Sequence, residues 1–84
     1  MATREFTIEE ASRIGGALGI DWTGIDIEQF RMGLRIELEH GARDKQTNVT
    51  NDDELMTGKI AWAHLKEIPD YYTRLQKMEA AAGS

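Results

Sequence analysis

The fold of this 84-residue chain is decided by the stretch DIEQFRMGLRIELEH, residues 26–40. Its large apolar residues recur every three or four positions, which places their side chains on one face of an α-helix. They are Ile27, Phe30, Leu34 and Leu38. Asp26 suits the N-terminal cap, and Gln29 three positions later fits the second half of a capping box. We therefore predict an amphipathic helix over residues 26–40 that stops at Gly41.

The residues before this stretch predict another helix. Thr7 and Glu10 have the spacing of a second capping box. Apolar residues then recur at helical spacing, at Ala11, Ile14 and Leu18. We predict a helix over residues 8–18, which Gly19 can end in the left-handed conformation. The glycines just before that stop, Gly15 and Gly16, suit close contact with a neighbouring element.

The residues after it predict two more helices. Thr50 or Asn51 suits the start of the first of these. Pro69 ends that helix and also suits the first position of the next one. The last helix is expected to present an apolar face of Tyr72, Leu75, Met78 and Ala82. The predicted fold class is all-α: a compact bundle of about four short helices over residues 8–18, 26–40, 51–68 and 69–82.

The length and composition limit the domain organisation. Two independent cores do not fit into 84 residues. We treat residues 1–84 as a single helical domain and expect frayed ends at residues 1–6 and 80–84. The chain has no cysteine, so it has neither a disulfide framework nor a thiolate metal site.

The charge balance argues against two classes of partner. Fifteen acidic and ten basic residues give a net charge of -5. Nucleic acids and anionic membranes both attract basic surfaces, so we expect neither as a partner. No apolar run approaches the ~18 residues of a membrane span. Residues 1–6 contain no apolar signal core, and we expect a cytoplasmic protein.

Two of the predicted helices each carry a glutamate and a histidine three positions apart. At ~100° per residue, Glu37 lies on the apolar face of its helix and His40 at the edge of that face. On the next helix, His64 and Glu67 also lie on an apolar face. A buried carboxylate is costly unless it is paired, hydrogen-bonded or bound to a metal. One interpretation is a site of two glutamates and two histidines for zinc, manganese or iron.

The same four residues have a structural interpretation. They could form His–Glu hydrogen bonds, and His40 could interact with the dipole at the C-terminus of its helix. Catalysis without a metal is a third option. The two pairs converge only if the connecting loop runs back along the bundle, because His40 ends one helix and His64 lies deep in the next. The sequence leaves these alternatives open.

The helix predicted over residues 51–68 is apolar on two sides. One side holds Met56, Ile60, Ala63 and Ile68, and the other holds Leu55, Trp62 and Leu65. In so small a chain, a helix that is apolar all round is either central or half in an interface. We expect Leu55, Trp62 and Leu65 to contact a protein partner or a second copy of the chain.

Three segments carry a family resemblance. They are GLRIELEHG at residues 33–41, TNVTNDD at 47–53 and KIAWAHLKEIPDYYTRL at 59–75. They resemble domain-of-unknown-function family 5661, a family of short proteins from microbes and phages. The resemblance extends from about residue 11 to residue 79 and includes the four glutamate and histidine positions. It implies a small helical domain and brings no activity with it.

Two functions of different classes follow. The first is a non-enzymatic helical module that acts by self-association or by binding a protein partner, as in a phage accessory protein or a virion component. A phage origin would make the virion a second location. The alternative is a metal-binding protein, or a metalloenzyme, with Glu37, His40, His64 and Glu67 as ligands. A weaker third idea is a protein that holds a small ligand between its helices.

Overall fold

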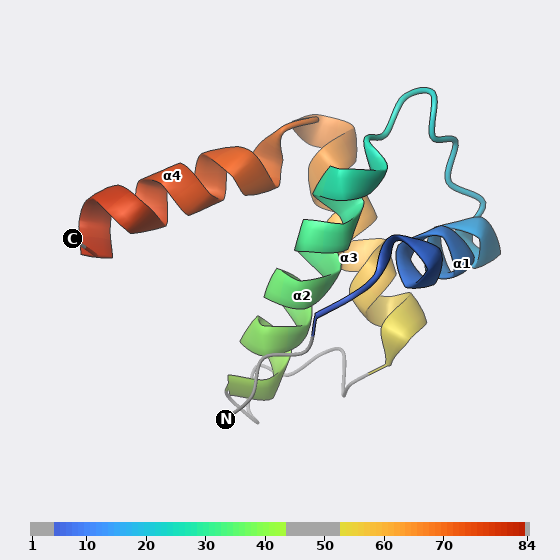
Figure 1. Cartoon of the computed structure of the whole chain (residues 1–84), viewed down its shortest axis with the longest axis horizontal. Coiled ribbons are helices and arrows are strands. Elements are labelled where there is room, and N and C mark those ends of the chain that lie inside the picture. The colour runs from blue at the N-terminus through green and yellow to red at the C-terminus, as the bar shows by residue number, and fades with distance from the viewer. Residues whose placement is uncertain (1–4, 44–52, 84) are drawn as a thin grey trace.

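Four α-helices form the described part of the structure, which is a computed structural model covering residues 5–43 and 53–83 (Figure 1). They are α1 (Ile8–Leu18), α2 (Ile27–Arg43), α3 (Glu54–Glu67) and α4 (Tyr71–Gly83). The side chains of residues 40–43 and 83 are not described. Over the described ranges there is no strand, and the predicted all-α class with about four helices is confirmed. Within the same ranges, no helix is long and apolar enough to cross a membrane.

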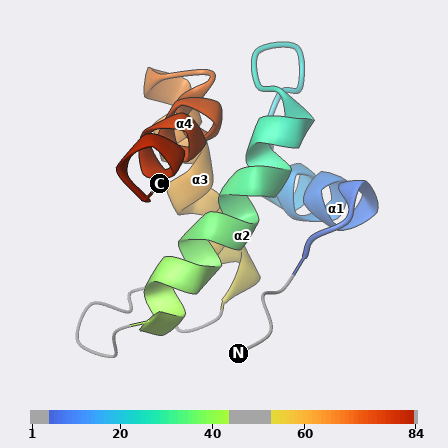
Figure 2. The same ribbon diagram turned by 60° about the vertical axis from the view of Figure 1, so that its left-hand side comes forward.

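Helices α1, α2 and α3 pack against one another, and α4 extends from them as an arm. Helix α2 packs against each of the other three. Helix α4 begins at the corner that follows α3 and points away from α1 (Figure 1). Its first turns lie near α2 and α3, as the turned view also shows (Figure 2). We call α4 the arm and the turn around Pro69 the corner.

The first helix begins and ends where local signals predict. The Thr7 hydroxyl accepts a hydrogen bond from the backbone N–H of Glu10 at 3.1 Å, and the Glu10 carboxylate accepts one from the backbone N–H of Thr7 at 3.0 Å. This is the predicted capping box. At the other end, Gly19 adopts a positive φ of 83° and closes the helix.

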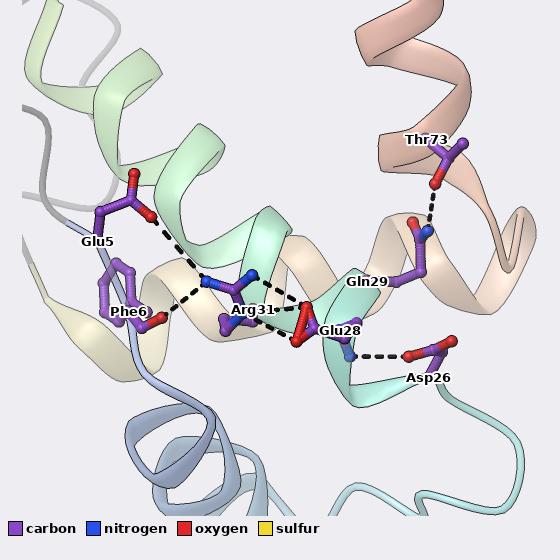
Figure 3. Close-up of polar contacts among 7 residues, drawn as sticks. All are labelled: Glu5, Phe6, Asp26, Glu28, Gln29, Arg31 and Thr73. Carbon is purple, nitrogen blue, oxygen red and sulfur yellow. Dashed lines mark hydrogen bonds and ion pairs between the residues drawn. The ribbon is translucent and has the colours of Figure 1, made fainter.

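The second helix keeps its predicted cap but not its predicted capping box. Asp26 Oδ1 accepts a hydrogen bond from the backbone N–H of Glu28 at 2.8 Å. The side chain of Gln29 instead donates to Thr73 Oγ1 on the arm (Figure 3). The expected capping box of Asp26 and Gln29 is therefore replaced by a contact between α2 and α4, because Thr73 is within reach of the Gln29 amide.

The third helix begins three residues later than predicted. Its cap is Asp53, whose Oδ1 accepts hydrogen bonds from the backbone N–H groups of Leu55 and Met56 at 2.8 and 3.0 Å. The expected caps Thr50 and Asn51 lie outside the described residues. The helix ends at Glu67 because Ile68, which precedes Pro69, is extended with φ -134°.

The buried stripe of α3 differs from both predicted sides. It consists of Thr57, Gly58, Ala61 and Leu65. Met56 is 44% exposed, and Ala63 and Ile68 are exposed as well. The prediction followed the largest side chains, whereas α3 contacts its neighbours through small ones. Small residues allow the helix axes to approach closely, so the core is narrow at this point.

Two helical glycines mark close approaches between helices. A Cβ on Gly33 of α2 would lie 2.5 Å from Cε2 of Tyr72 and 2.9 Å from Cβ of Ala61. A Cβ on Gly58 of α3 would lie 2.9 Å from Cδ1 of Leu18. Real Cβ atoms do not come so close to other heavy atoms. These positions therefore require glycine for packing, in α2 against α3 and α4 and in α3 against α1.

The segment before α1 is fastened to α2. Arg31 donates from Nη1 to the backbone carbonyl of Phe6 at 3.1 Å, and its Nη2 lies 3.0 Å from Glu28 Oε2 (Figure 3). Its Nη1 also lies 4.0 Å from Glu5 Oε2. Phe6 is a core residue, 2% exposed. Phe6 is therefore fixed to the body, and of the end where we expect fraying, residues 1–4 lie outside the described part.

The predicted apolar face of α4 is buried at one end only. Tyr72 is fully buried and Leu75 packs against the core. Met78 is 62% exposed and Ala82 is exposed too, because the arm has passed beyond the other helices by then. Helix α4 itself continues to Gly83.

Gly33→Ala is predicted to destabilise the domain. The new methyl group would overlap the fully buried ring of Tyr72. Such overpacking costs roughly 1–3 kcal/mol, which exceeds the gain of about 1 kcal/mol when alanine replaces glycine in a helix. Gly16→Ala is the matched control, because nothing lies within 4 Å of its Cβ position. Urea unfolding followed by circular dichroism measures both, and a Gly33→Ala chain as stable as the wild type contradicts this packing.

Candidate functional site

Three helices bring one glutamate, one histidine and two tyrosines together. Glu37 comes from α2, His64 from α3, and Tyr71 and Tyr72 from the first turn of the arm. Tyr72 donates its hydroxyl to Glu37 Oε2 at 2.8 Å. The same oxygen lies 3.4 Å from His64 Nε2. The ring of His64 stacks on that of Tyr71, with centroids 4.4 Å apart and planes 4° apart. We call these four residues the polar cluster.

The side chains of the polar cluster differ in their exposure to solvent. The Glu37 side chain is 12% exposed and that of His64 is 38% exposed. Burial of Tyr72, followed by the negative charge of Glu37 and the hydrogen bond to it, raises the pKa of the Tyr72 hydroxyl above its usual range. Tyr72 therefore remains a neutral donor to the carboxylate, and solvent reaches the imidazole of His64 more easily than the carboxylate of Glu37.

The four predicted metal ligands have different positions. Glu37 and His64 meet across α2 and α3, as a convergent site requires. Glu67 is exposed, and within the described residues no hydrogen bond or ion pair links it to Glu37 or His64. The side chain of His40 lies outside the described residues. Among the side chains that are described, no group of three or more His, Cys, Asp or Glu residues could hold a metal ion.

Sequence reasoning missed the two tyrosines. Tyr72 was placed on an apolar face as a core residue, which is correct for its ring but gave its hydroxyl no partner. The available signal was Glu37 itself, because a carboxylate on an apolar face needs a donor. The donor could not be identified from spacing, since Tyr72 lies 35 positions further along the chain.

A groove lies where the loop between α1 and α2 meets the corner. It has a volume of ≈ 350 Å³ and is open to solvent. Trp62 forms one wall, Ile25 and Gly24 form the other, and Leu65 and Pro69 also line it. A second depression, which contains Trp22 and Ile27, shares Gly24, Ile25 and Pro69 with the first. Together they form one mostly apolar surface, which we call the corner groove.

The three residues expected to bind a partner do not form one face. Leu65 is 1% exposed and belongs to the core, so it is not available as a surface anchor. Leu55 is 45% exposed but lies near the other end of α3. Trp62 is half-buried and lies in the corner groove, where Lys66 Nζ is 4.6 Å from the centre of its ring. Of the three, only Trp62 is therefore both accessible and part of the corner groove, whereas Leu55 lines a separate depression of ≈ 330 Å³ together with Leu18 and Met56.

The charged residues of the corner groove have both signs. Asp21 and Asp26 contribute carboxylates, and Lys66 contributes an ammonium group. Asp21 Oδ1 accepts hydrogen bonds from the backbone N–H and the hydroxyl of Thr23 at 3.0 and 2.8 Å. These bonds lower the pKa of the Asp21 carboxyl, so it stays ionised at neutral pH.

Tyr72→Phe is predicted to destabilise the domain by roughly 1–3 kcal/mol, because Glu37 would keep its burial and lose its donor. The effect should depend on pH. Because folding raises the pKa of Tyr72, the wild type loses stability as the pH rises past the ordinary tyrosine value near 10, where only the unfolded chain ionises at this residue. Tyr72→Phe should lose less over that range.

Unfolding free energies at pH 7 and above pH 10 measure both effects. Tyr71→Phe is the matched control, since among the described residues the Tyr71 hydroxyl makes no hydrogen bond. Equal alkaline losses in the wild type and Tyr72→Phe would contradict the assigned hydrogen bond.

The comparisons with known proteins give a family and identify no activity. A family model described as "Protein of unknown function (DUF5661)" matches residues 11–81. No curated protein and no solved structure matches the chain. The matched range includes most of α1, all of α2 and α3, the corner and most of the arm. The chain therefore belongs to the DUF5661 family.

Proposed function

We propose that this domain is a protein-interaction module that binds its partner through the corner groove. The observation that carries the proposal is the position of Trp62, half-buried in an open apolar groove with Lys66 over its ring. Partly exposed tryptophans in such grooves are common anchors of binding energy. Ile68, 36% exposed at the same corner, adds apolar surface.

Two further observations support this use of the groove. Both of its walls lie within the residues that the family model matches, so the groove belongs to the shared domain and not to an appended segment. Its open form suits a side chain or a helix of another protein better than an enclosed small molecule. An assembled particle such as a virion is one setting in which such a module would act.

Photo-crosslinking in cells tests this function. A photoreactive amino acid at Lys66 would lie at the groove, and one at Glu9 on α1 is the matched control at an exposed position. The expected result is a crosslinked product of discrete mass from position 66 only. Trp62→Ala, and Ile68→Ser at a more exposed site, should each reduce that product while the circular dichroism spectrum stays helical. Equal products from positions 66 and 9 would contradict the proposal.

A second function, metal binding, is favoured by one distance. Ligand bonds of about 2.1 Å to Glu37 Oε2 and His64 Nε2, which are 3.4 Å apart, give an angle at the ion of roughly 110°, close to tetrahedral. His40 lies one turn after Glu37 on α2, the position from which a third ligand is expected. Zinc, manganese or iron would suit carboxylate and imidazole ligands.

Elemental analysis of protein purified without chelators or a metal-binding tag tests this second function. About one transition ion per chain or per dimer, lost in both Glu37→Ala and His64→Ala, is the result that metal binding predicts. The cobalt absorption spectrum of the refilled protein would then report the geometry. Glu67→Ala is the control, since this exposed residue should not affect an ion held between α2 and α3. Protein without metal, with the same stability in a chelator, would leave the polar cluster as a structural network.

A further inference from the structure

We infer that the partner in the corner groove is the arm of a second copy of this chain, so that two copies exchange arms. This inference rests on the proposed function of the groove and names its occupant. It joins two surfaces of the chain: the open apolar groove, and a helix that extends from the body with apolar residues still exposed.

The arm carries an apolar seam that continues from the core into solvent. Its residues are Tyr71, Leu75, Met78 and Ala82, at intervals of four, three and four. At ~100° per residue they fall within about 60° of one another, and this spacing is typical of helices that pack against a second helix. The seam is half-buried at its first two positions and exposed at Met78 and Ala82. Its far half therefore presents apolar surface without cover from the described part of its own chain.

The charges of the two surfaces are complementary. The arm holds Arg74 and Lys77, both exposed, against a single acidic residue, Glu79, within a chain of net charge -5. The groove holds Asp21 and Asp26, whose hydrogen bonds within the described residues use Oδ1 in each case, so that Oδ2 remains for a cation. Arg74 already pairs with Asp70 at 2.7 Å, which leaves Lys77 as the stronger candidate for the contact.

The topology favours a second copy over the chain's own arm. Pro69 lines the corner groove and α4 starts two residues later, so the arm departs from the rim of its own groove and cannot fold back into it (Figure 1). If the two-fold axis runs across the arms, the arms lie antiparallel. With an overlap of about 10 Å, the length of helix from Tyr71 to Met78, each Met78 then reaches the partner's corner. Both contacts form together, and the assembly closes as a dimer.

The molar mass of the full-length chain, measured by light scattering and sedimentation across a concentration series, tests this inference. The wild type is expected to shift from monomer to dimer and not to larger species. Met78→Glu should weaken the dimer roughly tenfold or more, because it buries an unpaired carboxylate. Gln76→Glu is the matched control: it adds the same charge to the same exposed stretch of helix, about 130° away from the seam.

A charge exchange adds a readout that misfolding cannot mimic. Asp21→Lys and Lys77→Glu should each weaken the dimer, and the double variant should recover it. A wild type that stays monomeric, or a dimer that Met78→Glu leaves unchanged, overturns the inference. If the wild type is monomeric while position 66 crosslinks to another protein, the groove is a docking site and only its occupant was misidentified. If the wild type is monomeric and position 66 gives no specific crosslink, the proposed function of the corner groove is contradicted as well.

Discussion

The ring of Tyr72 and the methyl group of Ala61 both approach the backbone of Gly33, so that α4, α3 and α2 meet at one point. This close approach is possible only because α2 has no side chain there and α3 has a small one. The same ring carries its hydroxyl to the mostly buried Glu37, whose other polar neighbour among the described residues is His64 at 3.4 Å. The packing of α4 against the other helices and the hydrogen bonding of Glu37 therefore both depend on the side chain of Tyr72.

The positions of the corner and the arm depend on this contact of Tyr72. Tyr72, together with the contact between Gln29 and Thr73, fixes the first turn of α4. The remaining turns leave the body, and their apolar seam continues past the point where the core ends. On α3, His64 takes part in the polar cluster, whereas Trp62 lines the corner groove. The metal hypothesis and the docking hypothesis thus concern two sites of one helix, and a variant of one site can leave the other intact.

Helix ends that depend on neighbouring residues were predicted correctly from the sequence. Features that depend on contacts between helices were missed. The capping box at Thr7, the stop at Gly19 and the break at Pro69 depend on neighbouring residues, and the structure agrees with all three. The buried stripe of α3 was predicted incorrectly because side-chain size was used as the guide, whereas the close approach of α2 selects glycine and alanine. For the same reason Leu65 was assigned to a surface. Helical angles did place Glu37 and His64 each on an apolar face of its helix, but their meeting and the part of Tyr72 could be found only from the packed fold.

The most direct test of this account is hydrogen exchange along α4, measured residue by residue at increasing protein concentration. Amides next to the Tyr72 anchor should be protected at every concentration, since they belong to the folded body. Amides from residue 78 to residue 82 should exchange rapidly in dilute protein and become protected as the concentration rises, because the exposed half of the arm is ordered by the groove of a second copy. Protection at these residues that does not change with concentration would contradict the account.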